Sequence, residues 1–160
     1  FFLGDAPSRA EAVARSVAFK AGVVARDERE SGERALLNLG HTFAHAFEAE
    51  AGYAADLRHG EAVAVGCALA ADYAAATGRG PASLGERIRA ILKQAGLPRE
   101  PAELPGAPFD ADALLARMRS DKKNLGGRIR LVLPFGAGAC ETVDEESPER
   151  LLAFLKERAG

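Results

Sequence analysis

The sequence has 160 residues and a mass of 16.8 kDa, which is enough for one domain with a hydrophobic core. Hydrophobic residues make up 48% and charged residues 28%, a mixture that excludes a disordered tail. The formal net charge is -2, and no apolar run approaches the roughly 20 residues of a membrane span, so we expect neither nucleic-acid binding nor membrane insertion.

The first half of the chain is predicted to form three helices. The first covers 7–26 and is opened by Pro7 and Ser8. The second covers 33–51 as one continuous helix. The third covers 59–77, and its body is small and apolar on nearly every face, which is typical of a buried and closely packed helix.

The second half is predicted to contain three more helices and a β-hairpin. The helices cover 83–95, 110–119 and 148–158, a proline-rich loop covers 98–108, and the strands cover 128–133 and 140–143. No internal repeat or low-complexity linker divides the chain. We therefore expect residues 1–160 to form one mainly α domain with a small β-hairpin near residues 128–143.

All three histidines lie between positions 41 and 59, two of them on the predicted second helix. At about 100° per residue, one face of that helix carries four polar side chains within roughly 60° of one another, namely Arg34, Asn38, His41 and His45. Glu30 and Glu48 lie at the edge of this polar stripe. Such a stripe suits an anion or a metal, although two ordinary histidines sharing a face explain the spacing equally well.

His59 begins the predicted third helix, just before Gly60 and Glu61. Helices joined by a short connection pack antiparallel, which places His59 near the end of the second helix, around Ala51. His41 lies about two to three turns earlier. The pattern therefore permits His41 and His59 to converge if the connection folds back, but it does not establish their convergence.

Five segments carry motifs of a known family. They are DERESGERALLNLGHTFAHA at 27–46, GY at 52–53, HGEAVAVG at 59–66, DKKN at 121–124 and RLVLP at 130–134. Together and in this order they resemble the 3-dehydroquinate synthases. The resemblance implies the helical C-terminal domain of that fold, which binds metal and substrate, with the N-terminal NAD-binding domain absent from this chain. The missing initiator Met, and the lack of a glycine-rich βαβ fingerprint, agree with a part of a longer protein.

The resemblance also implies an activity. Members of the family are lyases of the shikimate pathway of aromatic amino acid biosynthesis. They convert 3-deoxy-arabino-heptulosonate 7-phosphate to 3-dehydroquinate and phosphate, using NAD and a divalent metal, zinc or cobalt. By the same resemblance we expect a small sugar acid phosphate as substrate, NAD bound mainly by the missing domain, a homodimer in the full-length cytoplasmic enzyme, and no activity from this chain alone.

Metal and substrate residues follow from the same motifs. His41 and His59 match the family's two metal-ligating histidines, whereas the third ligand, a glutamate, has no match upstream of His41. The residues expected to contact the substrate or to hold the polar network around it are Lys20, Glu30, Arg34, Asn38, His45 and Lys122. His45 and Asn38 match groups near the phosphate. The choice between Lys122 and Lys123 stays open.

Some of these residues also have an ordinary structural interpretation. A lysine pair at 122–123 is typical of a solvated turn, and Lys20 in an apolar helix is typical of a side chain that reaches to solvent. Cys67 and Cys140 are too far apart in sequence to indicate a metal-binding pair or a disulfide scaffold. We interpret them as inert thiols in a reducing compartment. Ala44, where the family commonly has glycine, adds a methyl group in a tight region.

Two other functions remain open on the sequence. One is a related enzyme: another sugar phosphate cyclase or, more distantly, a metal-dependent alcohol or glycerol dehydrogenase. The other is a non-catalytic helical module that keeps the histidines only for metal binding or assembly.

Overall fold

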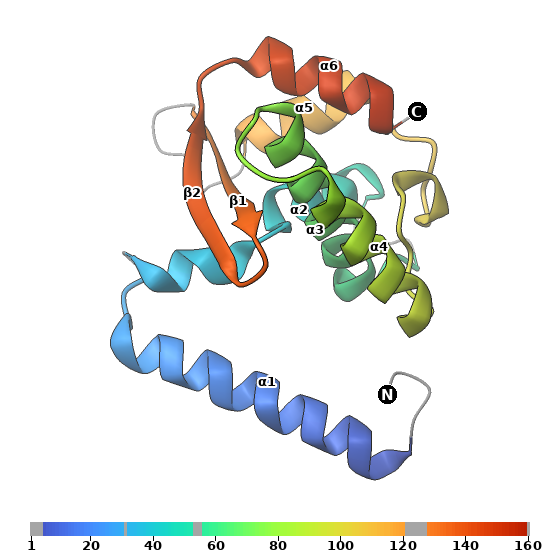
Figure 1. The fold of residues 1–160 in the computed structure, drawn as a ribbon. Coiled ribbons are helices and arrows are strands. Elements are labelled where there is room, and N and C mark those ends of the chain that lie inside the picture. Colours follow the sequence, from blue (N-terminus) through green and yellow to red (C-terminus); the bar gives the residue numbers. More distant parts are fainter. Residues whose placement is uncertain (1–4, 31, 53–55, 121–127, 160) are drawn as a thin grey trace.

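The computed structural model describes residues 5–30, 32–52, 56–120 and 128–159. In chain order these form α1 (Ala6–Arg26), the 3-10 helix η1 (Glu33–Asn38), α2 (His41–Glu50), α3 (His59–Ala76), α4 (Ser83–Ala95), the 3-10 turn η2 (Pro101–Glu103), α5 (Ala111–Ser120), β1 (Ile129–Gly136), β2 (Ala139–Glu145) and α6 (Pro148–Arg158). The mainly α fold with a small hairpin is confirmed (Figure 1).

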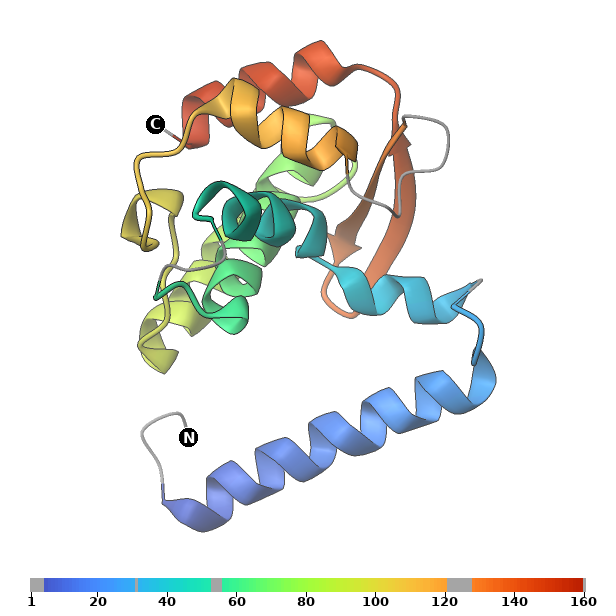
Figure 2. The same ribbon diagram turned by 180° about the vertical axis from the view of Figure 1, so that it is seen from behind.

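Helix α3 forms the centre of the main body. It packs against α2, α4 and β1, while α5 packs against α2 and α6 (Figures 1 and 2). Val65, Leu69 and Tyr73 of α3 are fully buried, and the alanines between them leave room for neighbouring helices to approach closely. The predicted buried third helix is confirmed.

The hairpin covers one side of this body. Strand β1 pairs antiparallel with β2, with Leu131 opposite Val143, and the register shifts between Pro134 and Gly136. The side chains of Ile129, Leu131 and Leu133 are buried, and β1 packs on α3. The strands are longer than the sequence indicated because pairing continues to both ends of the hairpin.

Local capping signals explain why most helix boundaries agree with the prediction. The Asp5 carboxylate accepts a hydrogen bond of 2.8 Å from the Ser8 amide at the start of α1. The Ser147 hydroxyl caps α6 in the same way, with Pro148 at its first position. Helix α4 ends at Gly96, which adopts a left-handed conformation.

The prediction of one continuous helix over 33–51 is wrong. Residues 33–38 form a 3-10 helix, and the chain turns at Leu39 and Gly40 before α2 begins at His41. Gly40 has a φ of 78°, a left-handed value that a side chain disfavours. The polar stripe predicted for a continuous helix therefore does not form one helix face. Arg34 and Asn38 lie on η1, whereas His41 and His45 lie on α2 and His59 lies on α3.

Helix α1 stands apart from the main body (Figures 1 and 2). Val23 is its buried residue, and its main contacts are with η1. Val13, Val17 and Phe19 are all more than 60% exposed. In the described part of the chain, none of the helices combines the length and apolar character that crossing a membrane requires.

Candidate active site

His41 is the first residue of α2, and the turn at Gly40 sets its position. The Nδ1 atom of His41 lies 3.2 Å from the carbonyl oxygen of Leu39. A hydrogen bond from Nδ1 to a carbonyl places the ring proton on Nδ1 and the lone pair on Nε2. This arrangement prepares Nε2 of His41 to act as a ligand.

The N-terminal turn of α2 is anchored to neighbouring elements. The Thr42 hydroxyl donates a hydrogen bond of 2.9 Å to the carbonyl oxygen of Arg130 on β1. Gly40 lies directly on α3, because a Cβ atom built on Gly66 would be 2.2 Å from the Gly40 carbonyl oxygen. The family motifs around residues 40, 66 and 130 therefore meet at the base of this site.

His59 is the first residue of α3, and Glu61 fixes the helix start. The Glu61 carboxylate accepts a hydrogen bond of 3.1 Å from the backbone amide of Arg58, so the His59 backbone is held at the first helical position. Nδ1 of His59 lies 3.0 Å from Oε1 of Glu48 on α2. This contact joins the start of α3 to the last turns of α2.

The three histidines converge. The ring centroid of His41 lies 5.3 Å from that of His59 and 5.7 Å from that of His45, and the centroids of His45 and His59 are 6.1 Å apart. The structure thus resolves the point that the sequence left open, since His59 reaches back to His41. His45, one turn after His41, completes a compact imidazole cluster.

The spacing of His41 and His59 fits two ligands of one divalent metal ion. With a Zn–N bond of about 2.1 Å, two imidazole centroids around a tetrahedral metal lie about 5 Å apart, close to the observed 5.3 Å. Among the residues that the structure describes, no three His, Cys, Asp or Glu side chains are grouped so as to hold a metal. Two ligands from this chain leave further coordination positions for other groups.

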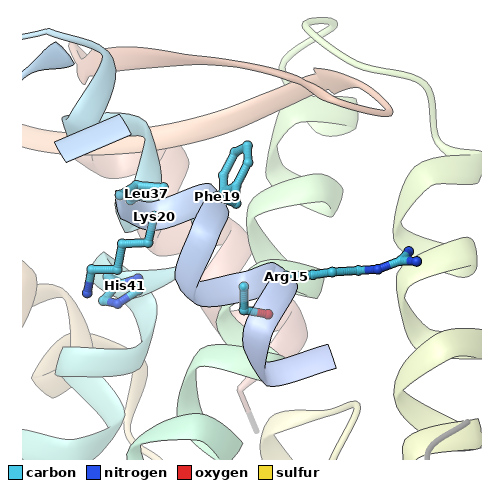
Figure 3. Close-up of a pocket in the computed structure, with 6 residues that line it drawn as sticks. Arg15, Phe19, Lys20, Leu37 and His41 are labelled. Atoms are coloured by element: carbon cyan, nitrogen blue, oxygen red, sulfur yellow. The ribbon is translucent and has the colours of Figure 1, made fainter. Parts of the chain in front are cut away.

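Lys20 lies beside His41 in a pocket between α1 and the η1–α2 segment. The pocket has a volume of about 480 Å³ and is lined by Arg15, Ser16, Phe19, Lys20, Leu37 and His41. Figure 3 shows the Lys20 side chain pointing toward the His41 ring, whereas Arg15 points away from it. Two of the residues predicted to form the site, Lys20 and His41, therefore line one pocket from different helices.

Glu30, Arg34 and Asn38 form a second polar group. The Asn38 amide donates a hydrogen bond of 2.7 Å to Oε1 of Glu30, and Nε of Arg34 lies 3.8 Å from Oε2 of Glu30. Arg34 also donates a hydrogen bond of 2.6 Å to the carbonyl oxygen of Glu28. Glu30 thus contacts the side chains of both Arg34 and Asn38. Leu39, the next residue after Asn38, contacts His41 through its carbonyl oxygen and so connects this group to the histidines.

Lys122, the remaining predicted substrate residue, lies outside the described residues, as does Lys123. Sequence reasoning assigned no role to Glu48 or Glu61, which orient the start of α3. Their signals were present: Glu48 follows His41 by seven residues on the same helix face, and Glu61 stands at the third position of its helix.

The structure supports an inert role for the cysteines. Burial raises the pKa of the Cys67 thiol to about 11, and its Sγ lies 3.5 Å from the Leu39 carbonyl oxygen. Burial also raises the pKa of the Cys140 thiol. Because the thiolate is the reactive form, neither sulfur is prepared for nucleophilic chemistry.

A family model described as "3-dehydroquinate synthase C-terminal" matches residues 3–124. The chain belongs to the 3-dehydroquinate synthase family. It is 47% identical over 154 residues to the 3-dehydroquinate synthase of Ruegeria sp. (strain TM1040), covering 96% of this chain and 41% of that protein. Over 156 residues it is 52% identical to the enzyme of Xanthomonas axonopodis pv. citri (strain 306), covering 95% and 41%. The chain thus spans about two fifths of the length of these 3-dehydroquinate synthases.

Two solved cyclase structures contain a part with the same fold. A 2-deoxy-scyllo-inosose synthase complexed with carbaglucose-6-phosphate, NAD+ and Co2+ matches with a TM-score of 0.70 at 21% identity, covering 89% of this chain and 39% of that one. ValA, a 2-epi-5-epi-valiolone synthase from Streptomyces hygroscopicus subsp. jinggangensis 5008 with NAD+ and Zn2+ bound, matches with a TM-score of 0.65 at 23% identity, covering 86% and 37%. This chain therefore shares its helical fold with a part of each of these two cyclases.

Proposed function

We propose that residues 1–160 form the C-terminal metal- and substrate-binding domain of a 3-dehydroquinate synthase. The complete enzyme would convert 3-deoxy-arabino-heptulosonate 7-phosphate to 3-dehydroquinate and phosphate. Membership of the family supports this proposal. The observation that carries it is the convergence of His41 and His59 at a spacing that fits metal ligands, next to Lys20 in a pocket.

In this proposal Nε2 of His41 and Nε2 of His59 hold a divalent metal ion, zinc or cobalt, together with ligands from outside the described residues. Two solved structures with this fold are described with Co2+ and with Zn2+. When bound, such an ion supplies Lewis acidity and orients substrate oxygens. The hydrogen bonds that Nδ1 of His41 donates to the Leu39 carbonyl and Nδ1 of His59 donates to the Glu48 carboxylate keep the two rings in the required orientation and tautomer.

The other residues of the site bind and orient an anionic substrate. Lys20 places a positive charge beside His41, and Glu30 holds the donors of Arg34 and Asn38 in a defined arrangement. Preorganised donors of this kind suit carboxylate and phosphate groups. His45 stands one turn from His41, where we place the phosphate-side contact. Lys122 is proposed as a further cation on the family motif alone.

NAD would be bound mainly by an N-terminal domain outside this chain. This assignment is supported by the share of the relatives that the chain covers, 41%, and by the NAD+ in both solved cyclases. The family resemblance also leads us to expect a homodimer in the cytoplasm for the complete enzyme.

The decisive experiment measures phosphate release from the heptulosonate phosphate by the complete protein encoded by this gene, with NAD and zinc or cobalt. We expect His41→Ala to lower turnover by at least about 100-fold, because loss of the metal removes several kcal/mol of transition-state stabilisation. The control Glu50→Ala removes an exposed ion pair between α2 and Arg117. This variant should keep full turnover. The proposal fails if the wild-type protein releases no phosphate, or if His41→Ala works as well as wild type.

The same assay decides between this function and that of the structurally similar cyclases. The 2-deoxy-scyllo-inosose synthase structure contains carbaglucose-6-phosphate, a compound with a phosphate group and no carboxylate. The cations Lys20 and Arg34 favour a substrate with two anionic groups. Turnover of glucose 6-phosphate in preference to the heptulosonate phosphate would therefore reassign the chain to another cyclase.

A further inference from the structure

We propose that Glu48 is a positioning residue for metal binding, which acts by orienting His59. This inference rests on the proposed function, since it concerns the metal that His41 and His59 would hold. Nδ1 of His59 lies 3.0 Å from Oε1 of Glu48. A carboxylate that accepts a hydrogen bond from Nδ1–H fixes the tautomer and the ring orientation and leaves the Nε2 lone pair for the metal.

The exposure of the two partners fits this role. The Glu48 side chain is only 16% exposed, whereas the His59 side chain is 55% exposed. The carboxylate is therefore held mostly among protein atoms, while the imidazole projects from the start of α3 toward the His41 ring. A partly buried acceptor holds a ring more firmly than a solvated one, because fewer water molecules compete for the hydrogen bond.

The two proposed ligands have different hydrogen-bond partners. His41 faces a neutral backbone carbonyl at Leu39, and His59 faces a carboxylate at Glu48. The backbone carbonyl cannot be removed by substitution, but the carboxylate can. His59 lies on α3, whereas His41 lies on α2. The orientation of the His59 ring therefore depends on a contact across the α2–α3 interface. Glu48 supplies this contact from the face of α2 that carries His41 and His45.

A purely structural ion pair between α2 and α3 would involve the same two residues, so the test must separate the two roles. In the complete protein, the zinc dissociation constant is measured by chelator competition for wild type, Glu48→Gln and Glu48→Ala. Replacing a hydrogen-bond partner of a metal-bound histidine commonly costs 10- to 100-fold in affinity. We expect that loss for Glu48→Ala, and a smaller loss for Glu48→Gln, whose amide oxygen can still accept a hydrogen bond from Nδ1–H.

Glu50→Ala provides the matched control. It removes a carboxylate from the same helix two residues later, where it pairs with Arg117 at 3.3 Å, away from the histidines. Its zinc affinity should stay within about twofold of wild type, because an exposed ion pair contributes little. The visible absorption spectrum of the cobalt-loaded proteins gives a second readout: Glu48→Ala should shift the bands at saturating cobalt, and Glu50→Ala should not.

Several outcomes would overturn the proposal. Wild-type affinity and an unchanged cobalt spectrum in Glu48→Ala would exclude the positioning role. A lower melting temperature of metal-free Glu48→Ala, with unchanged affinity well below that temperature, would assign Glu48 to helix packing only. His59→Ala separates this failure from failure of the proposed function: if it retains wild-type zinc affinity, the metal assignment itself is wrong. If His59→Ala loses the metal while Glu48→Ala does not, only the role of Glu48 fails.

Discussion

At Gly66 the backbone of α3 packs directly against the turn that begins α2. A Cβ atom at Gly66 would lie 2.2 Å from the Gly40 carbonyl oxygen and 3.3 Å from the Ala44 amide nitrogen. These are backbone atoms, which cannot rotate away as a flexible side chain can. The position of His41 relative to α3 therefore depends on position 66 being a glycine, which has no side chain.

We expect Gly66→Ala to lower the free energy of unfolding by about 1–3 kcal/mol, the usual cost of forcing an extra methyl group into a packed interface. Urea unfolding followed by circular dichroism measures this change. Gly60→Ala on the same helix is the control, because a Cβ atom there meets nothing within 4 Å. Its expected change has the opposite sign, a gain of about 0.4–1 kcal/mol, since alanine restricts the unfolded chain. Equal effects at the two positions would contradict the close approach.

At the scale of elements, Glu145 joins three parts of the fold. Its carboxylate, at the end of β2, accepts hydrogen bonds of 2.6 Å from the Tyr73 hydroxyl on α3 and 2.9 Å from Arg150 on α6. It also accepts a bond of 2.8 Å from the Ser147 amide. Glu145 is 5% exposed, so this network is a buried polar link between helix, strand and helix.

This network makes stability depend on pH. Burial by itself raises the pKa of Glu145, but the hydrogen bonds from Tyr73, Ser147 and Arg150 outweigh it and lower the pKa below its usual 4.5. The group therefore contributes stability above about pH 4.5, and this contribution is lost as the pH falls through the lower pKa of the folded state. The pKa of Tyr73 is raised to about 12, chiefly by burial, so its hydroxyl stays a donor throughout.

We expect Glu145→Gln to destabilise the protein by about 1.5–3 kcal/mol at pH 7, the range for a hydrogen bond to a charged group. The difference from wild type should shrink as the pH falls through the lowered pKa of Glu145, because the wild-type carboxylate then becomes protonated as well. Urea unfolding at several pH values measures both effects. Glu141, on the same hairpin, forms an exposed ion pair with Arg79. The control Glu141→Gln should therefore change the free energy of unfolding by less than about 1 kcal/mol. A pH-independent difference for Glu145→Gln would refute the network's role.

The elements differ in how far local sequence determines them. The starts of α1 and α6 and the end of α4 follow from Asp5, Ser147 and Gly96, because capping involves only neighbouring residues. The interruption before α2 could not be predicted in the same way. Gly40 adopts its left-handed conformation where it meets Gly66, a contact between residues far apart in the sequence. Helical periodicity carries no information about such a contact.

The same distinction applies to the candidate site. Residue types and motifs singled out His41, His45 and His59, but their convergence depends on how α2 packs against α3. Periodicity placed Arg34 and Asn38 on the histidine face, whereas the 3-10 geometry of η1 directs them to Glu30. The residues of the candidate site could therefore be singled out from the sequence, whereas their arrangement in space could not.

At the scale of the whole molecule, the pocket that contains Lys20 and His41 is formed by two parts of the fold that differ in how deeply they are buried. The histidines stand on helices of the packed body, whereas Lys20 stands on α1, where Val23 is the buried residue. Regions with little buried apolar surface open at a lower free energy than the core does. The position of Lys20 relative to His41 therefore depends on a helix of which only Val23 is buried.

Hydrogen exchange of the 160-residue chain tests this difference directly. A helix of about 20 residues with few tertiary contacts is only marginally stable in water, so amides of the first half of α1, around Val13 and Val17, should exchange within about tenfold of unprotected rates. Amides of α3 around Leu69, which is fully buried, should be protected by at least about 1,000-fold, because they exchange only on global opening. The amides around Val23, where α1 meets the body, should fall between these limits and serve as an internal control. Equal protection of α1 and α3 would show that the exposed face of α1 is covered in solution, and the Lys20 side of the pocket would then be as rigid as the histidine side.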